Sequence, residues 1–200
     1  GRYRVLISGQ GPRIANRIES EGLIRQRRFA PTATSLQFNA RGRESRTHIT
    51  YDYDRGLVHY RHASQSFLLG RWRVGEDVIG IPAGQPLDDL VTVILNYAEG
   101  QLEADGPGAY RTSVVRRASA EGEELDDVQA KGYGADIVPL RLTVTQDPEA
   151  GQPVCLLDIT RFSSWAMASH PARITFGPNR RPEAVHVSLR LGTTAEIAFE

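Results

Sequence analysis

The sequence contains one cysteine, one lysine and no long apolar run. Its single cysteine, Cys155, cannot form a disulfide within the chain, and the apolar residues on either side of it predict a buried thiol. No stretch approaches the roughly 18 apolar residues that a membrane-crossing helix needs, so we expect no transmembrane span. The formal net charge is zero, which excludes the basic excess typical of nucleic-acid-binding proteins. We therefore expect no nucleic-acid partner.

Signatures of cofactor and metal sites are missing as well. The glycine-rich segments lack the spacing of dinucleotide-binding and phosphate-binding loops, and no histidine has a cysteine or acidic partner at a recognisable ligand spacing. His59 and His62 differ by an odd number of residues, so a regular strand would direct them to opposite faces. The acidic run at residues 121–127 could hold a cation such as calcium, but it fits no EF-hand spacing and a solvated loop explains it better. We predict no metal site and no cofactor.

Alternation of apolar and polar residues is the main pattern present, and it is typical of half-buried β-strands. The clearest example is a hairpin in which residues 47–53 and 57–62 flank a short connection, where Gly56 can adopt the positive φ of a tight turn. Further strands are expected at 3–8, 27–41, 66–81, 110–117, 125–131, 137–144, 154–159, 172–176, 184–191 and 195–199. Two hundred residues are within the range of one domain, so we assign residues 1–200 to a single β-rich domain.

One segment, residues 86–99, has the apolar spacing of a helix. Its apolar stripe consists of Leu87, Leu90, Val91, Ile94 and Tyr97. This stripe is too continuous to be left in water, and a curved sheet needs a filler for its inner face. The fold predicted from these patterns is mainly β: a strongly curved antiparallel sheet, open-barrel or clam-like, packed on one amphipathic helix.

The polar residues of the same segment are expected to lie away from the core. Asp88 and Asp89 favour the positive end of the helix and point too far apart to form an acid/base pair. Thr92 and Asn96 are expected to face solvent or a polar rim. On this view Leu90→Asp should remove several kcal/mol of stability, whereas Asn96→Lys should change it by less than about 1 kcal/mol.

The order of several short motifs is similar to that of a known bacterial family. These motifs are a first strand containing Tyr3, a Phe29-Ala30-Pro31 step, a hairpin containing Tyr51-Asp52-Tyr53, and Ile81-Pro82 ahead of a helix that opens with Asp88 and Asp89. Over residues 3–145 the chain resembles the exported domain-of-unknown-function family numbered three thousand one hundred and eight. The resemblance implies a β-rich fold and a periplasmic or cell-surface location after removal of a signal peptide. It implies no agreed activity and supplies no catalytic residues.

Aromatic residues on the expected strands are candidates for the walls of a ligand-binding groove. These candidates are Phe38, Tyr51, Tyr60, Phe67 and Trp72. Their alternative role is simply to fill the core. Residues 1–46 also contain ten arginines against three glutamates, and some of these arginines could line a concave face and hold phosphate or carboxylate. An ordinary solvated basic surface is the preferred explanation of that bias.

Two functional hypotheses from different classes follow. The preferred one is a noncatalytic periplasmic or cell-envelope protein that binds an amphiphile, a glycan or a protein partner in or on its curved sheet; it rests on analogy between folds. The alternative is a hydrolase or lyase acting on an envelope polysaccharide or lipid, with His48, Asp52 and His170 as candidate catalytic residues. The serines that shortly precede His170 lack the Gly-x-Ser-x-Gly framework of a serine hydrolase, so a loop docked on the sheet explains that segment better.

Overall fold

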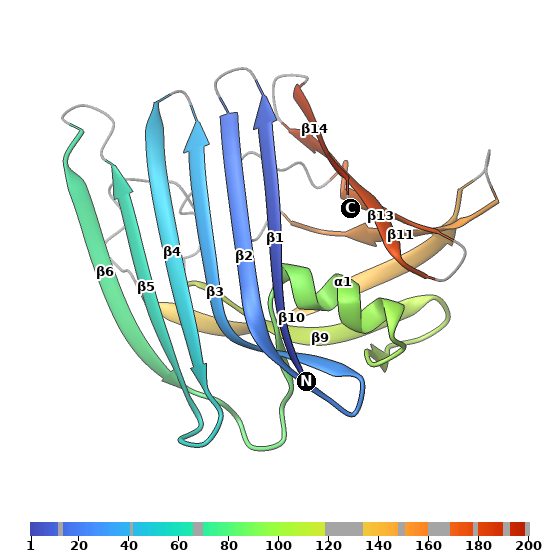
Figure 1. Ribbon diagram of the computed structural model, residues 1–200, viewed down its shortest axis with the longest axis horizontal. Coiled ribbons are helices and arrows are strands. Elements are labelled where there is room, and N and C mark those ends of the chain that lie inside the picture. Colours follow the sequence, from blue (N-terminus) through green and yellow to red (C-terminus); the bar gives the residue numbers. More distant parts are fainter. Residues whose placement is uncertain are drawn as a thin grey trace.

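The computed structural model consists of two sheets of mainly antiparallel strands with one helix between them (Figure 1). It describes residues 1–11, 14–40, 42–65, 70–118, 134–147, 151–159, 169–177, 180–189 and 193–198. Among these residues, no helix has the length and apolar character needed to cross a bilayer. The strand expected at 125–131 lies outside the described residues, and the one expected at 66–81 is described only from residue 70 onward. Each of the other expected strands overlaps an observed one.

The first sheet is a six-stranded meander in which each strand pairs with the next along the chain. Its strands are β1 (Arg2–Gly11), β2 (Ile14–Arg25), β3 (Arg28–Ala40), β4 (Arg43–Asp52), β5 (Leu57–Gln65) and β6 (Trp72–Gly80). The predicted hairpin is confirmed as β4 and β5, and Gly56 has the expected positive φ of 65°. Gly22 lies where the β2–β3 register shifts, and a Cβ atom there would come 2.1 Å from the carbonyl oxygen of Ala30, so this close approach requires glycine.

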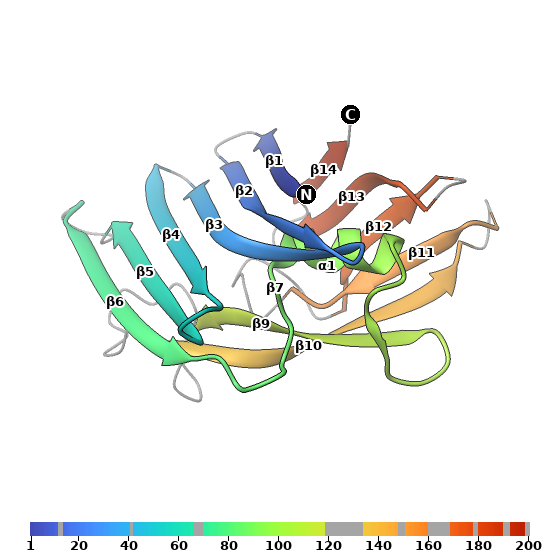
Figure 2. The same cartoon turned by 60° about the horizontal axis from the view of Figure 1, so that its bottom comes forward.

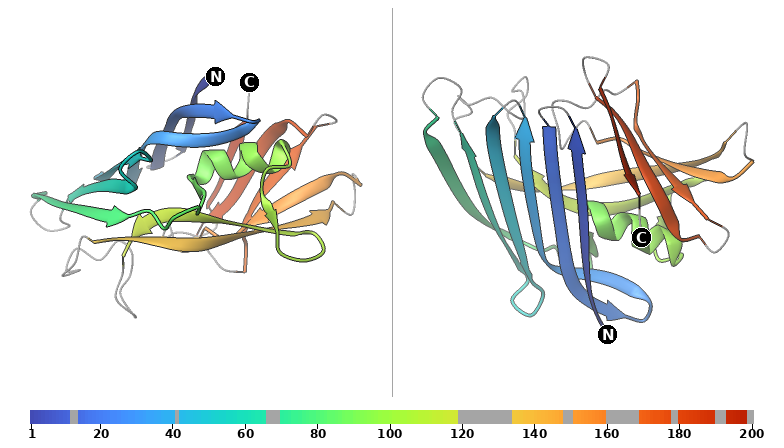
Figure 3. Two further views of the ribbon diagram at one scale, coloured as in Figure 1. Left: turned by 90° about the horizontal axis from the view of Figure 1, so that it is seen from below. Right: turned by 45° about the horizontal axis from the view of Figure 1, so that its top comes forward.

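The second sheet runs in the order β14-β13-β12-β11-β10-β9-β7, with β8 also paired to β9. Its strands are β7 (Leu87–Asp88), β8 (Glu103–Ala104), β9 (Ala109–Arg117), β10 (Ala135–Gln146), β11 (Pro153–Leu157), β12 (Ala172–Phe176), β13 (Pro182–Leu189) and β14 (Thr193–Ala198). Strand β1 approaches β14, and β6 approaches β10, so the sheets come together at two places (Figure 3). The mainly β, clam-like fold is confirmed, with the curved surface divided between two sheets that form no closed barrel among the described strands.

Helix α1 (Leu90–Ala98) begins at Leu90 rather than at Pro86, because Asp89 caps it. The Asp89 carboxylate accepts hydrogen bonds from the backbone N–H groups of Val91 (2.9 Å) and Thr92 (2.7 Å), and the Thr92 hydroxyl accepts one from the backbone N–H of Asp89 (2.8 Å). Leu87, predicted to belong to the helix, instead lies in β7, which pairs in parallel with β9.

The helix fills the space between the sheets, as predicted, but it is buried on more than one side (Figure 2). Its buried residues are Val91, Thr92, Val93, Ile94, Asn96 and Tyr97. The expectation that Thr92 and Asn96 face solvent is wrong, since both are 0% exposed. One side of α1 packs against the second sheet, while β2 and β3 of the first sheet cover another. A helix enclosed in this way has no solvent-facing stripe to hold its polar residues.

Two groups of apolar side chains form the core. The larger lies between α1 and strands β9 to β13, and the smaller lies between β4, β5, β7 and the ends of β9 and β10 nearest to them. Val114 belongs to the larger group and Val115 to the smaller, so both faces of β9 are covered at this point. Cys155 is 0% exposed in the larger group, which confirms the predicted buried thiol, and burial raises its pKa to about 12.

Two adjacent buried carboxylates, Asp88 and Asp89, connect the sheets to the helix. Besides capping α1, Asp89 accepts hydrogen bonds from the hydroxyls of Ser20 in β2 (2.5 Å) and Thr34 in β3 (2.6 Å). The two aspartates were expected at the positive end of the helix; Asp89 lies there as its cap, and both are buried, with exposed fractions of 0% and 5%. Capping explains part of the role of Asp89, and its remaining bonds join the first sheet to the helix.

Asp88 has a separate set of partners. Its carboxylate accepts hydrogen bonds from Arg28 (2.7 Å), from Asn96 (2.6 Å) and from the hydroxyl of Thr112 in β9. Burial raises the pKa of Asp88, while the Arg28 guanidinium and these hydrogen bonds oppose that effect. Removing one member of such a network leaves a buried charge or donor without its partner, which costs several kcal/mol.

Asn96 joins α1 to the first strands of the chain. Its side-chain oxygen accepts a hydrogen bond from the backbone N–H of Phe29 (2.8 Å), and its amide nitrogen donates to the Phe29 carbonyl (2.9 Å) as well as to Asp88. These bonds hold the beginning of β3 against the helix, so the residue predicted to tolerate lysine is one of the most constrained in the structure.

We expect Asn96→Ala to lower the free energy of unfolding by about 3 kcal/mol or more, because it leaves the buried polar groups of Phe29 and Asp88 without partners. Glu99→Gln, at the C-cap of the same helix but partly exposed and paired with the exposed Arg27, should cost less than about 1 kcal/mol. Urea denaturation of both variants measures the difference. If both variants lower the free energy of unfolding by the same small amount, Asn96 does not join the helix to β3.

Candidate functional site

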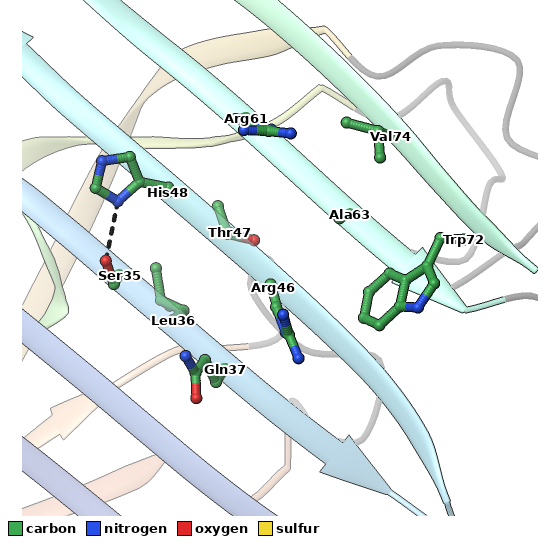
Figure 4. A pocket seen from close by; sticks show the side chains of 10 residues that line it. All are labelled: Ser35, Leu36, Gln37, Arg46, Thr47, His48, Arg61, Ala63, Trp72 and Val74. Carbon is green, nitrogen blue, oxygen red and sulfur yellow. Dashed lines mark hydrogen bonds between the residues drawn. The ribbon is translucent and has the colours of Figure 1, made fainter.

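A hollow lies on the outer face of the first sheet, the face that points away from α1, across strands β3 to β6 (Figure 4). It has a volume of about 400 Å³ and is open to solvent. Its lining residues are Ser35, Leu36, Gln37, Arg46, Thr47, His48, Arg61, Ala63, Trp72 and Val74. This volume is in the lower part of the range of small-ligand sites.

Strand alternation explains most of the side chains that reach the hollow, although Leu36 and Thr47 of its lining lie at inner positions. Ser35, His48 and Arg61 are cross-strand partners, so their side chains lie on one face of the sheet. The intervening residues Ile49 and Tyr60 point to the opposite face and are buried in the smaller core group. The outer positions therefore carry mainly polar groups because the inner positions already supply the core.

One end of the hollow is aromatic. Trp72 is 41% exposed and Val74 is 50% exposed, although both are large apolar residues. The guanidinium of Arg46 lies over the Trp72 ring, 5.1 Å from the ring centre, and its Nε donates a hydrogen bond to Glu44 (2.7 Å). This arrangement orients the indole by a cation–π contact and leaves part of it accessible.

The other end is polar and balanced in charge. Arg61 in β5 forms an ion pair with Glu76 in β6 at 3.2 Å, and both side chains are well exposed. Exposed ion pairs contribute little to stability, so this pair can open to bind a ligand at small cost. Because Arg46 and Arg61 each have an acidic partner, the hollow offers hydrogen-bond donors and acceptors without a large excess of positive charge.

His48 adds a further polar group between these ends. Its Nδ1 is 2.9 Å from the Ser35 hydroxyl, and its Nε2 is 3.4 Å from the Thr50 hydroxyl. Neither partner is a carboxylate that could orient the ring as a general base. Both ring nitrogens have hydroxyl partners within the sheet.

The structure does not bring the three candidate catalytic residues together. Asp52 lies four residues beyond His48 on the same face of β4, a separation of about 13 Å along a strand, and it accepts a hydrogen bond from the backbone N–H of Arg55. His170 precedes β12 in the second sheet and lies 2.8 Å from the hydroxyl of Ser169. The hydrolase or lyase hypothesis therefore has no assembled group of these residues.

The candidate ligand-wall residues are also separated. Tyr51 and Tyr60 are 4% and 3% exposed and fill the core, so they do not line an accessible groove. Phe38 is partly buried and lies on the same inner face, whereas Trp72 lies on the outer face. Phe67 lies outside the described residues. The sequence pattern identified suitable aromatic residues but not the face on which each one lies.

Sequence reasoning missed most residues of the hollow, including Ser35, Gln37, Arg46 and Arg61. A signal was present: these residues recur at alternate positions of neighbouring strands, next to Trp72. It could be used only after the strand register was known. Among the described residues, no group of three or more histidine, cysteine or acidic side chains could hold a metal ion.

Comparisons with known proteins add no function. No family model matches the chain, and no curated protein matches it, so the family number expected from the sequence is unconfirmed. A solved structure that it resembles is the beta-barrel-like protein of domain of unknown function DUF1849 from Brucella abortus. The identity is 10% and the TM-score 0.38, with 98% of this chain and 94% of that chain covered. The structural neighbour thus belongs to an uncharacterised bacterial family.

The contact between Arg46 and Trp72 can be measured by a double-mutant cycle. We expect Arg46→Gln and Trp72→Leu to show a coupling free energy of about 0.5–1 kcal/mol in urea denaturation. The matched cycle of Arg46→Gln with Val78→Thr should show none, because Val78 is also exposed on β6 but lies six residues beyond Trp72. Coupling that is absent from the first cycle would show that Arg46 does not orient the indole.

Proposed function

We propose that the protein is a noncatalytic cell-envelope protein that binds a glycan in the outer hollow. The observation that carries this proposal is the partly exposed indole of Trp72 beside charge-balanced polar groups in an open hollow. A sugar ring presents apolar C–H groups on its faces and hydroxyls around its edge. Trp72 offers an apolar platform for the faces, and the ion pair of Arg61 with Glu76 offers a donor and an acceptor for adjacent hydroxyls.

The same features make the other partner classes less suitable. An amphiphile is normally buried in a mainly apolar cavity, whereas this hollow is open and has few apolar side chains at one end. A strongly anionic polymer would need arginines without acidic partners, yet Arg46 and Arg61 both have one. A periplasmic or cell-surface location is part of the proposal, and only the sequence resemblance supports it.

A protein with Trp165→Phe, in which Trp72 is the sole tryptophan, tests the proposal directly. We expect it to bind oligosaccharides on an array of bacterial envelope glycans, and the matching soluble oligosaccharide should change the Trp72 emission. Trp72→Ala and Arg61→Gln should each weaken binding by about tenfold or more, since each removes a contact worth about 1.4 kcal/mol or more.

Arg4→Gln serves as the matched control. Arg4 is an exposed arginine on the same face of the sheet, paired with Glu19 in the neighbouring strand but outside the hollow, so its loss should leave affinity unchanged. Absence of binding to every glycan on the array would contradict the proposal. Palmitate or a copurified protein that binds and depends on Trp72 would instead support the amphiphile or protein-partner alternatives.

A further inference from the structure

A second feature, independent of the hollow, lies at the end of β9. Arg117 is the last residue of this strand and is 8% exposed. Its Nε and Nη2 atoms are both buried, and neither has a hydrogen-bond partner. Within the described part of the chain Arg117 also forms no ion pair. A guanidinium remains charged at all accessible pH values, so this side chain places in the interior a positive charge that no acid of the described residues pairs with directly.

The two unpartnered atoms form one edge of the guanidinium. Nε–H and Nη2–H point in nearly the same direction, and together they are the fork that binds the oxygens of a carboxylate or phosphate. Arg27 shows this use in the same protein, because its Nε and Nη2 donate to Glu99 at 3.0 and 2.8 Å. Arg116, the neighbour of Arg117, has only its Nε atom buried without a partner. An entire empty fork therefore distinguishes Arg117.

Among the described residues around Arg117, no acid occupies this fork. Its cross-strand partner is Ala135, whose backbone N–H donates to the carboxylate of Asp77 (2.8 Å). The other oxygen of Asp77 accepts from the backbone N–H of Val78 (2.8 Å), so both oxygens of this nearby acid already have donors. On the first sheet, Tyr60 is near enough for the charge of Arg117 to lower its pKa, against the larger effect of burial, which raises it to about 12.

We propose that Arg117 is an anion-binding residue that holds a small oxyanion, a carboxylate or a phosphate, between the two sheets. The fork supplies two charge-assisted hydrogen bonds to the oxyanion, and the oxyanion supplies the acceptors that the described residues do not give this fork. A single arginine matches one carboxylate better than a doubly charged group, so acetate is the simplest probe.

Thermal unfolding of the full chain tests this site, because a ligand that binds only the folded state raises the Tm. Melts in sodium acetate and in sodium phosphate are compared with melts in sodium chloride at equal ionic strength. We expect at least one oxyanion to raise the Tm by about 3 °C or more over chloride. A response to acetate alone identifies a carboxylate site, and a response to phosphate alone identifies a phosphate site.

Arg117→Lys is the decisive variant, since it keeps the charge and removes the planar fork. Its Tm should be the same in oxyanion and chloride buffers. Arg111→Lys is the matched control: Arg111 lies on the same strand, but it is exposed and paired with Glu103, so the oxyanion response should remain. An equal oxyanion response in the wild type and Arg117→Lys, or none in the wild type, would overturn the proposal.

If Arg117→Lys does not fold, the wild-type protein provides the same test by NMR spectroscopy. The Nε–H resonance of Arg117 should move on addition of the oxyanion and not on addition of chloride, while that of Arg111 should stay in place. Failure of this site would not affect the proposed glycan site, because the glycan array and the Trp72 emission report on the opposite face of the first sheet.

Discussion

The fold depends on a buried acidic pair, Asp88 and Asp89, at the point where the first sheet, the helix and the second sheet meet. Asp89 caps α1 and accepts hydrogen bonds from Ser20 and Thr34, while Asp88 accepts them from Arg28, Asn96 and Thr112. Apolar contacts between sheets are not directional and would allow several relative positions. Hydrogen bonds to two buried carboxylates allow few, because a displaced donor leaves a buried polar group unsatisfied. The network therefore determines how the two sheets are placed.

This arrangement also determines where a ligand can bind. The helix and two apolar groups fill the space between the sheets, so the aromatic residues that point inward, such as Tyr51 and Tyr60, serve the core. Burial and then the neighbouring carboxylates raise the pKa of Tyr51, which keeps its phenol neutral. The outer face of β3 to β6 remains accessible, and it is there that exposed aromatic and polar groups gather.

The two proposed sites use arginine in different physical settings. In the hollow, Arg46 and Arg61 are exposed and paired with acids, so a ligand exchanges one set of weak surface interactions for another. At the end of β9, Arg117 is buried and its fork is empty, so in the proposed site an oxyanion supplies the acceptors that the described residues do not provide. The first setting favours reversible binding of an uncharged polar ligand, and the second favours selection by charge and planar geometry.

The sequence by itself determined the local structure at positions where the pattern of neighbouring residues is enough to fix it. Alternation identified most strands, a flexible glycine marked the hairpin of β4 and β5, and apolar neighbours predicted the burial of Cys155. Only the tertiary structure decided which face of each strand is covered, and this separated Trp72 from Tyr51.

The tertiary structure also decided the burial of Asp88, Thr92 and Asn96. These three residues are four positions apart, so a helical pattern places them on one side. The same spacing is found in an exposed polar stripe and in a buried hydrogen-bond network. What distinguishes the two is whether donors such as Arg28 and Thr112, far away along the chain, are brought to that side, and no local pattern contains this information.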